Sequence, residues 1–227
     1  MKALLSTKVG PPEALEYLDA PDPVAEEGQV VIAVKAAGVN FPDALMIEDK
    51  YQFKPPRPFA PGGEIAGVIE SVGPGVTNVK VGQRVIGSTG SGGFAEKVKL
   101  QAARVMPMPD GMPFDEASAF ILTYGTSYYA LKDRGHLKAG ETVLITGAAG
   151  GVGISAIEIT KAFGAKAIAA VSSEEKAAFA KAAGADDAVV YPAGPLNKDQ
   201  SKQLAEDFKR VCGGCADVVY DSVGCSF

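Results

Sequence analysis

The sequence is poor in the residues from which metal sites and disulfide frameworks are built. Its 227 residues include no tryptophan, a single histidine, His136, and three cysteines, Cys212, Cys215 and Cys225. Because first-row catalytic metals usually take imidazole or thiolate ligands that converge in space, we expect no catalytic metal. Three cysteines close together are too few for a disulfide framework. No apolar run approaches the roughly 18 residues of a membrane helix, so we expect no membrane partner.

An excess of positive charge is also missing. The 22 basic and 27 acidic side chains give a formal net charge of -5, so a polyphosphate backbone is repelled on average and nucleic acid is not expected as a partner. The N-terminal segment has neither an apolar h-region nor a small-residue cleavage site, which predicts a cytoplasmic protein. Hydrophobic residues make up 47% of the chain and charged ones 22%, as in ordinary globular domains.

The two halves of the sequence follow different patterns. Up to about residue 105, short segments that alternate apolar and polar residues are separated by Gly and Pro, which predicts antiparallel strands in a small irregular barrel. The expected strands are Lys2–Leu5, Val30–Ala36, Ile65–Val72, Arg84–Ile86, Phe94–Leu100 and Arg104–Met106. From Ser127 onward, helical patterns alternate with apolar runs, which predicts a parallel sheet wound by helices on both faces. The expected strands there are Thr142–Thr146, Lys166–Val171, Ala188–Tyr191 and Ala216–Tyr220.

The strongest chemical signal is a glycine-rich stretch between an expected strand and an expected amphipathic helix. Glycines in such a turn let the backbone approach a pyrophosphate, and the helix N-terminus supplies N–H groups and the positive end of a dipole. The strand before it and the further strands at βαβ intervals favour a dinucleotide site over glycines that serve only tight packing. The predicted contacts are Gly147, Ala149, Gly150, Gly151, Val152 and Gly153.

The end of the next strand indicates which dinucleotide binds. An NAD site normally places a carboxylate there for the adenosine ribose hydroxyls, whereas this chain has Ser172 and Ser173, with Lys176 one helical turn on. A serine can donate to a 2′-phosphate and a lysine can neutralise it, so NADP(H) is the expected cofactor. The opposing feature is the adjacent pair Glu174 and Glu175, for which the alternative is a solvent-facing place in the first turn of a helix.

A series of short segments, spread in order over almost the whole chain, carries a family resemblance. The segments are residues 37–43, 61–67, 79–85, 126–131, 148–153, 184–186 and 219–224. They resemble the medium-chain dehydrogenase/reductase superfamily, and within it the zinc-free NADPH:quinone oxidoreductase (zeta-crystallin-like) family. The resemblance implies a GroES-like irregular β-barrel over residues 1–124 as the substrate domain. It implies a doubly wound Rossmann domain over residues 125–227 as the NADP-binding domain, with the active site in the cleft between them.

The resemblance also bears on the metal. Zinc-dependent relatives carry Gly-His-Glu where this chain has Gly62, Gly63 and Glu64, so the metal-binding histidine is missing. Glu64 is therefore expected to support its loop by hydrogen bonding. Cys212 and Cys215 form a C-x-x-C pair, but they follow an expected helix instead of preceding one. The helix dipole has the wrong sign there to activate a thiol, so no redox role is expected.

Without zinc, hydrogen-bond donors must meet the charge that develops on a substrate oxygen. The resemblance places Asn40 and Asp43 near the nicotinamide and matches Tyr51 to the tyrosine of the following loop. Tyr51 is the expected donor, with Asn40 polarising or positioning the substrate. The alternative is that Tyr51 only packs as a loop side chain. Acidic residues in the loop over residues 46–51 stand where the family often has Arg-x-Gly.

The resemblance assigns the remaining cofactor contacts. Thr126 matches a threonine near the nicotinamide carboxamide, although its position also suits a helix N-cap. Tyr191 matches a residue beside the adenosine phosphate, or is a plain sheet-edge residue. Ser222 and Val223 follow the fourth strand, where the nicotinamide half would pass.

The expected activity is hydride transfer from NADPH to a quinone or another conjugated carbonyl, such as an enone or an enoyl thioester. Family members continue past Gly224 for roughly another third of their length, so we expect an incomplete sheet with Val218 and Val219 on an open edge. The alternative for such a truncated chain is a non-catalytic, cofactor-binding remnant. A small-molecule quinone or enone is the expected partner, and a homodimer is left open.

Overall fold

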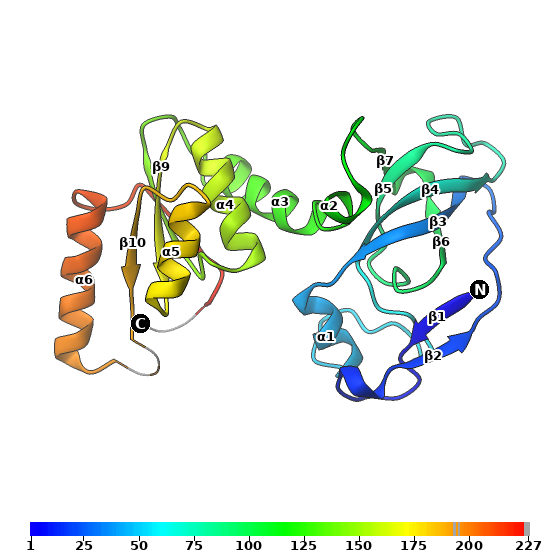
Figure 1. Ribbon diagram of the computed structural model, residues 1–227, viewed down its shortest axis with the longest axis horizontal. Helices are drawn as coiled ribbons and strands as arrows, with labels where there is room; N and C mark the ends of the chain where they lie inside the picture. The colour runs from blue at the N-terminus through cyan, green and yellow to red at the C-terminus, as the bar shows by residue number, and fades with distance from the viewer. Residues whose placement is uncertain (193, 195, 225–227) are drawn as a thin grey trace. The chain divides into compact units, whose positions relative to one another are not determined.

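The computed structural model describes residues 1–192, 194 and 196–224 and divides the chain into two compact units, Met1–Leu122 and Thr123–Phe227 (Figure 1). The domain border expected from the sequence lies two residues later, between residues 124 and 125. Among the described residues, no helix combines the length and the apolar character that crossing a bilayer demands.

The first unit contains two antiparallel sheets. A two-stranded sheet pairs β1 (Lys2–Leu5) with β2 (Glu16–Asp19). A five-stranded sheet has the order β6-β3-β4-β5-β7. Its strands are β3 (Gln29–Gly38), β4 (Glu64–Val72), β5 (Arg84–Ser88), β6 (Lys97–Gln101) and β7 (Val105–Pro107). All the strands expected in this half are present, whereas β2 was missed because its four residues are exposed and show no alternation.

The five-stranded sheet forms the core of the first unit with alternate residues of its central strands. Val30, Ile32, Ile65 and Val85 are fully buried in one cluster. Each such side chain contributes roughly 1.5–3 kcal/mol when it is removed from water. The apolar residues of the alternating pattern that predicted these strands are therefore the residues that form the core.

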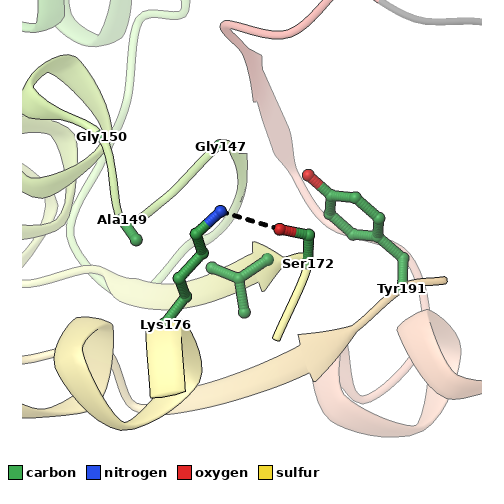
Figure 2. A pocket seen from close by; sticks show the side chains of 7 residues that line it. Gly147, Ala149, Gly150, Ser172, Lys176 and Tyr191 are labelled. Carbon is green, nitrogen blue, oxygen red and sulfur yellow. Dashed lines mark hydrogen bonds between the residues drawn. The ribbon is translucent and has the colours of Figure 1, made fainter. Parts of the chain in front are cut away.

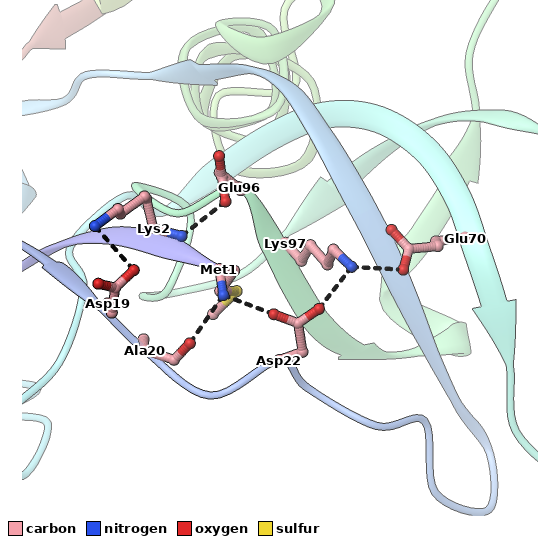
Figure 3. A network of polar contacts seen from close by, with 8 residues as sticks. All are labelled: Met1, Lys2, Asp19, Ala20, Asp22, Glu70, Glu96 and Lys97. Carbon is pink, nitrogen blue, oxygen red and sulfur yellow. Dashed lines mark hydrogen bonds and ion pairs between the residues drawn. The ribbon is translucent and has the colours of Figure 1, made fainter.

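Ion pairs cover part of the surface of the first unit. Lys97 Nζ lies 2.7 Å from Asp22 and 2.8 Å from Glu70, and Lys2 pairs with Asp19 at 2.8 Å (Figure 3). These contacts join the N-terminal segment to β4 and β6. Exposed pairs of this kind contribute little to stability because water screens them.

The helices of the first unit are short. They are α1 (Phe41–Ile47), α2 (Phe114–Ser118) and the 3-10 turns η1 (Pro12–Ala14) and η2 (Ala102–Arg104). Asn40 is the extended N-cap of α1, with proline in the first turn. A proline there loses no hydrogen bond, because the first N–H groups of a helix have no intrahelical acceptor. The following helix α3 (Ile121–Tyr128) continues into a π-helical turn, η3 (Tyr129–Arg134).

The second unit is a four-stranded parallel sheet with the order β10-β9-β8-β11. Its strands are β8 (Thr142–Thr146), β9 (Lys166–Val171), β10 (Asp187–Val190) and β11 (Val218–Asp221), and its helices are α4 (Gly151–Ala162), α5 (Glu174–Ala182) and α6 (Lys198–Cys212). Figure 1 shows α4 and α5 on one side of the sheet and α6 on the other. The expected doubly wound parallel sheet is thus confirmed.

Alternate residues of the strands pack on opposite faces of the sheet, against α4 and α5 on one face and against α6 on the other. On β8, Val143 and Ile145 pack under α4, whereas Leu144 packs with Leu204 and Val211 of α6. Burial on both faces explains the apolar runs of the two central strands, β8 and β9. β11 is an edge strand, and Val219 on it is 61% exposed, as expected.

Candidate functional site

The glycine-rich stretch forms a tight loop between β8 and α4, which we call the phosphate loop (residues 147–150). Gly147 has a left-handed backbone with φ +59°, and Gly150 is the extended N-cap of α4. The Gly150 N–H donates to Gly147 O at 2.9 Å, and Ile154 N–H donates to Gly150 O at 2.8 Å. The amides of Gly151, Val152 and Gly153 therefore lie in the first helical turn, where N–H groups have no intrahelical acceptor and the dipole is positive.

Gly153 lets α4 lie directly against the phosphate loop. A Cβ at this position would be 2.4 Å from Gly147 O and 2.6 Å from Ala148 Cα, so any larger residue must push the helix away. This glycine serves close packing, while the loop glycines before it shape the approach to the helix N-terminus. The combination is the geometry that a bound diphosphate requires.

A pocket of about 190 Å³ opens beside the phosphate loop. It is lined by Gly147, Ala149, Gly150, Val171, Ser172, Lys176 and Tyr191. Lys176 Nζ donates to Ser172 Oγ at 2.9 Å, and Figure 2 shows this pair between the loop and the ring of Tyr191. An exposed ammonium, a hydroxyl and a helix N-terminus thus meet in one place, and all three favour an anion.

Ser173 and the two glutamates after it have local roles in α5. Ser173 is the N-cap of this helix, and its Oγ accepts a hydrogen bond from Lys176 N–H at 3.2 Å. Glu174 and Glu175 occupy the first turn and are exposed, which is the dipole-favoured arrangement that we considered for them. Ser173 is not among the residues that line the pocket, so its contact with a cofactor stays a prediction.

The turn after β11 is bonded to the end of β8. Thr146 Oγ1 donates to Asp221 Oδ1 at 2.5 Å, and Ser222 Oγ donates to Thr146 O at 2.9 Å. A Cβ on Gly147 would lie 2.8 Å from Ser222 Oγ and 3.0 Å from a methyl group of Val223, so this turn contacts the phosphate loop. The predicted contacts Ser222 and Val223 therefore lie next to the loop.

Asp221 organises this turn and was not among the predicted residues. Its Oδ1 accepts from Val223 N–H at 3.0 Å and Gly224 N–H at 3.1 Å as well as from Thr146. The hydrogen bond from Thr146, followed by those from Gly224 and Val223, holds the pKa of the Asp221 carboxyl below its ordinary value. A hydroxyl and a carboxylate at the carboxyl ends of neighbouring parallel strands are the sequence signal that could have found this pair.

In the first unit, the predicted residue Asp43 is buried and fully occupied by backbone donors. It is 4% exposed, its Oδ2 accepts from Asn40 N–H at 2.8 Å, and its Oδ1 accepts from Gly62 N–H at 2.9 Å. Burial raises the pKa of the Asp43 carboxyl, while these backbone hydrogen bonds act to lower it. Asp43 thus ties the start of α1 to the loop before β4, and its placement near a nicotinamide stays a prediction.

Asn40 is joined by its side chain to Glu64. Asn40 Nδ2 donates to Glu64 Oε1 at 2.9 Å, and Leu122 N–H donates to Glu64 Oε2 at 2.9 Å. Glu64 is 1% exposed. It supports the surrounding segments by hydrogen bonding, as expected from the sequence.

Tyr51 is half-buried and packs against a small apolar cluster. Met46, Ile47 and Phe59 form this cluster, with Tyr51 at its margin. In the preceding loop, Asp49 takes a left-handed backbone with φ 56°, a conformation that aspartate tolerates better than most residues. The packing corresponds to the alternative role of Tyr51, and its role as a donor stays a prediction.

The suggestion that Thr126 is a helix N-cap was wrong. Thr126 lies inside α3, which begins at Ile121, and its side chain is exposed. In the first turn of this helix, the Leu122 N–H donates to the Glu64 carboxylate. An acceptor supplied by a distant strand leaves no local sign in the sequence, and contact of Thr126 with a carboxamide stays a prediction.

Cys212 and Cys215, the two described cysteines, lie at and after the C-terminal end of α6, as expected from the sequence. Cys212 ends α6, Gly213 takes the left-handed cap conformation, and Gly214 N–H donates to Lys209 O at 2.8 Å. Burial raises the pKa of the Cys212 thiol. Cys225 lies outside the described residues. Within the described part of the chain, no three His, Cys, Asp or Glu residues are grouped so that they could hold a metal ion.

Each half of the chain matches a known family. Residues 26–110 match the alcohol dehydrogenase GroES-like domain, and residues 151–226 match the family described as zinc-binding dehydrogenase. Together with the five-stranded antiparallel sheet and the four-stranded parallel sheet, these matches confirm the expected GroES-like and Rossmann-type fold. The expectation of a zinc-free chain rests on the residues, because the second family description mentions zinc.

Several of the similar proteins are named oxidoreductases. Quinone oxidoreductase-like protein 2 homolog from Nematostella vectensis is 36% identical over 225 residues, covering 98% of this chain and 59% of that relative. A solved probable oxidoreductase from Mycobacterium abscessus is 42% identical with a TM-score of 0.88, covering 98% of this chain and 69% of that one. The quinone oxidoreductase of Escherichia coli, solved with NADPH, is 33% identical with a TM-score of 0.89, at coverages of 100% and 67%. The chain spans about three fifths of the length of the curated relatives it matches.

Proposed function

Because the chain belongs to the quinone oxidoreductase family of the medium-chain dehydrogenases/reductases, we propose that it binds NADP(H) at the phosphate loop and transfers a hydride from NADPH to a quinone or another conjugated carbonyl. The observation that carries this proposal is the pocket in which Lys176 and Ser172 lie beside the phosphate loop. The name and the NADPH complex of the Escherichia coli structure support the same choice.

The residues of the second unit fit the two anionic parts of this cofactor. The N–H groups at the start of α4 suit the diphosphate, and Gly147 and Gly150 leave no side chain between the backbone and a ligand. The Lys176 ammonium and the Ser172 hydroxyl suit a 2′-phosphate. Hydrogen bonds to charged groups contribute about 1.5–3 kcal/mol each, which corresponds to a factor of roughly 10 to 100 in affinity.

When bound, the reduced nicotinamide supplies a hydride. Transfer of that hydride and one proton to a quinone yields a hydroquinone and the oxidised cofactor. The chain has to stabilise the negative charge that develops on the quinone oxygen, and hydrogen-bond donors can do this without a metal. We assign this donor role to the Tyr51 hydroxyl and a positioning role to Asn40, as the family pattern implies.

The cofactor assignment is tested with Lys176→Ala. We expect the dissociation constant for NADPH, measured by fluorescence titration, to rise about 10- to 100-fold while that for NADH changes little, because only NADPH has a 2′-phosphate. Lys181→Ala is the matched control, since Lys181 lies on the same helix and pairs with Asp187 at 2.9 Å. Equal losses for the two cofactors, or none, would contradict the assignment of the 2′-phosphate to this pocket.

The reaction is tested by NADPH oxidation with a panel of quinones, enones and enoyl thioesters. Oxidation with quinones that falls strongly in Tyr51→Phe supports the proposal. Turnover of enoyl thioesters alone would identify the alternative reductase of the same superfamily. If the chain binds NADPH but reduces none of these acceptors, the alternative of a non-catalytic, cofactor-binding remnant is supported instead.

Location and assembly are secondary proposals. We propose a cytoplasmic location and keep a homodimer as a proposal. Analytical ultracentrifugation over a range of concentrations tests the dimer, and a monomer at all concentrations would contradict it.

A further inference from the structure

Glu64 is a buried carboxylate whose hydrogen-bond donors are both neutral. It is 1% exposed, and its two oxygens accept from the Asn40 side-chain amide and from the Leu122 backbone N–H. Burying a charge costs free energy unless it is paired, so a well-packed neutral residue would stabilise this position at least as well. A carboxylate here therefore calls for a role other than stability.

The surroundings of Glu64 fix the position of its carboxylate. Gly38 is its partner across β3 and β4, and a Cβ on Gly38 would lie 2.7 Å from Glu64 Oε1 and 2.5 Å from Ser118 O. The glycine leaves just enough room for the carboxylate, and the neighbouring backbone closes the other side. Glu64 consequently presents its Oε1 at one place.

The contact with Glu64 also decides which way the Asn40 amide points. Only Nδ2 can donate to a carboxylate, and the opposite orientation would bring two acceptor oxygens to the same 2.9 Å separation. The backbone of Asn40 is fixed as well, because its N–H donates to buried Asp43. The Asn40 Oδ1 must therefore point away from Glu64.

We propose that Glu64 is a positioning residue for Asn40. It holds the amide with Nδ2 on Glu64, so that Oδ1 faces the Asp43 N–H of the capping box and keeps a second lone pair for a hydroxyl or N–H donor of a bound molecule. This makes more specific the role expected from the sequence, in which Asn40 polarises or positions the substrate. The identity of the bound molecule rests on the proposed function, whereas the orientation of the amide does not.

The inference is tested with Glu64→Gln, which keeps the shape but has one acceptor oxygen for two donors. We expect the kcat for NADPH oxidation to fall about tenfold, as loss of one aligned hydrogen bond does, while the NADPH dissociation constant stays close to that of the wild type. The one unmade hydrogen bond is expected to lower the free energy of unfolding, so kcat is measured well below the unfolding midpoint of the variant. Glu70→Gln is the matched control, because Glu70 is on the same strand, exposed and paired with Lys97. A kcat unchanged by Glu64→Gln, or lowered equally by Glu70→Gln, overturns the inference.

A double-mutant cycle separates positioning from a merely structural role. If Glu64 acts through Asn40, Glu64→Gln lowers kcat in the wild type but causes no further loss in an Asn40→Ala background. The same loss in both backgrounds overturns the inference, since it shows that Glu64 acts without Asn40.

A readout without substrate keeps this inference distinct from the proposed reaction. The side-chain amide signals of Asn40, identified by their loss in Asn40→Ala, are expected to exchange slowly with solvent in the wild type and faster in Glu64→Gln. If NADPH is not oxidised at all, the proposed function fails while this measurement still decides the inference. If Glu64→Gln does not fold, the wild-type signals decide it, and rapid exchange there overturns it.

Discussion

The phosphate pocket of the second unit and the Asn40–Glu64 cluster of the first are built from different groups. In the second unit, the proposed cofactor site is formed largely by the backbone of the phosphate loop and the start of α4, and the side chains Ser172 and Lys176 are exposed. In the first, the carboxylates of Asp43 and Glu64 are buried and their oxygens are already bonded within the protein. A site formed by backbone amides requires glycines, because a side chain would block the approach to the backbone. A buried polar cluster is stable only if each of its polar atoms has a hydrogen-bond partner.

The largest effect is expected from Gly153→Ala, which tests whether the phosphate site depends on a missing side chain. The new Cβ would lie 2.4 Å from Gly147 O, so we expect a loss of about 1–3 kcal/mol in the free energy of unfolding and weaker NADPH binding. Urea denaturation and cofactor titration measure the two effects. Gly125→Ala is the control: nothing lies within 4 Å of its Cβ position, so up to about 1 kcal/mol of stabilisation is expected inside α3. If the two variants had the same unfolding free energy and the same NADPH affinity, the phosphate loop would not depend on the missing side chain at Gly153.

The next effect is expected from Asp43→Asn, which tests whether the first unit depends on a fully satisfied buried carboxylate. An amide offers one acceptor where two backbone N–H groups donate, so we expect a loss of about 1–3 kcal/mol in the free energy of unfolding near neutral pH. Urea denaturation checks this, with Asp110→Asn, an exposed aspartate of the same unit, as the control. A variant as stable as the wild type would show that the cluster tolerates an unmade hydrogen bond.

The two units should also differ in how one aspartate of each responds to pH. Burial raises the folded-state pKa of Asp43 above the ordinary 3.8, so the part of its contribution that depends on titration is fully present below that pH and is lost as the pH rises through the folded-state pKa. The hydrogen bonds from Asn40 N–H and Gly62 N–H remain above that pH. The pKa of Asp221 is lowered, so its contribution is present above pH 3.8 and is lost as the pH falls through the folded-state pKa. Unfolding curves of the wild type, Asp43→Asn and Asp221→Asn across acidic pH should give difference profiles of opposite slope. Slopes of the same sign would refute the assigned environments.

The smallest effect is expected from Asp22→Asn, because Asp22 belongs neither to the pocket beside the phosphate loop nor to the buried cluster around Asn40 and Glu64. The hydrogen bond from Lys97 lowers the pKa of Asp22 to about 2, so the contribution of this exposed pair is present above pH 3.8 and is lost as the pH falls toward 2. At neutral pH we expect a change in the unfolding midpoint close to the scatter of replicate measurements, and smaller still in high salt. A large, salt-independent loss would show that the surface network in Figure 3 matters more than its exposure implies.

Local patterns predicted much of the second unit. The strand Thr142–Thr146 was predicted with its observed bounds, and the glycine-rich loop and the helix after it lie where the βαβ pattern placed them. Such units can be predicted from the sequence because the strand end, the glycine-rich turn and the helix N-terminus lie within a few consecutive residues. β2 escaped prediction because its four exposed residues lack the alternation that burial on one face creates.

The sequence by itself determined the two-domain fold class and the phosphate loop, because hydrophobic period and glycine spacing are local properties of the chain. Only the tertiary structure supplied the acceptor in the first turn of α3, since this acceptor is Glu64, 58 positions away from Leu122. The pairing of Thr146 with Asp221 across 75 positions and the orientation of the Asn40 amide were decided in the same way. A hydrogen bond depends on distances of a few tenths of an ångström, and residues far apart in the sequence reach such distances only when the sheets bring them together.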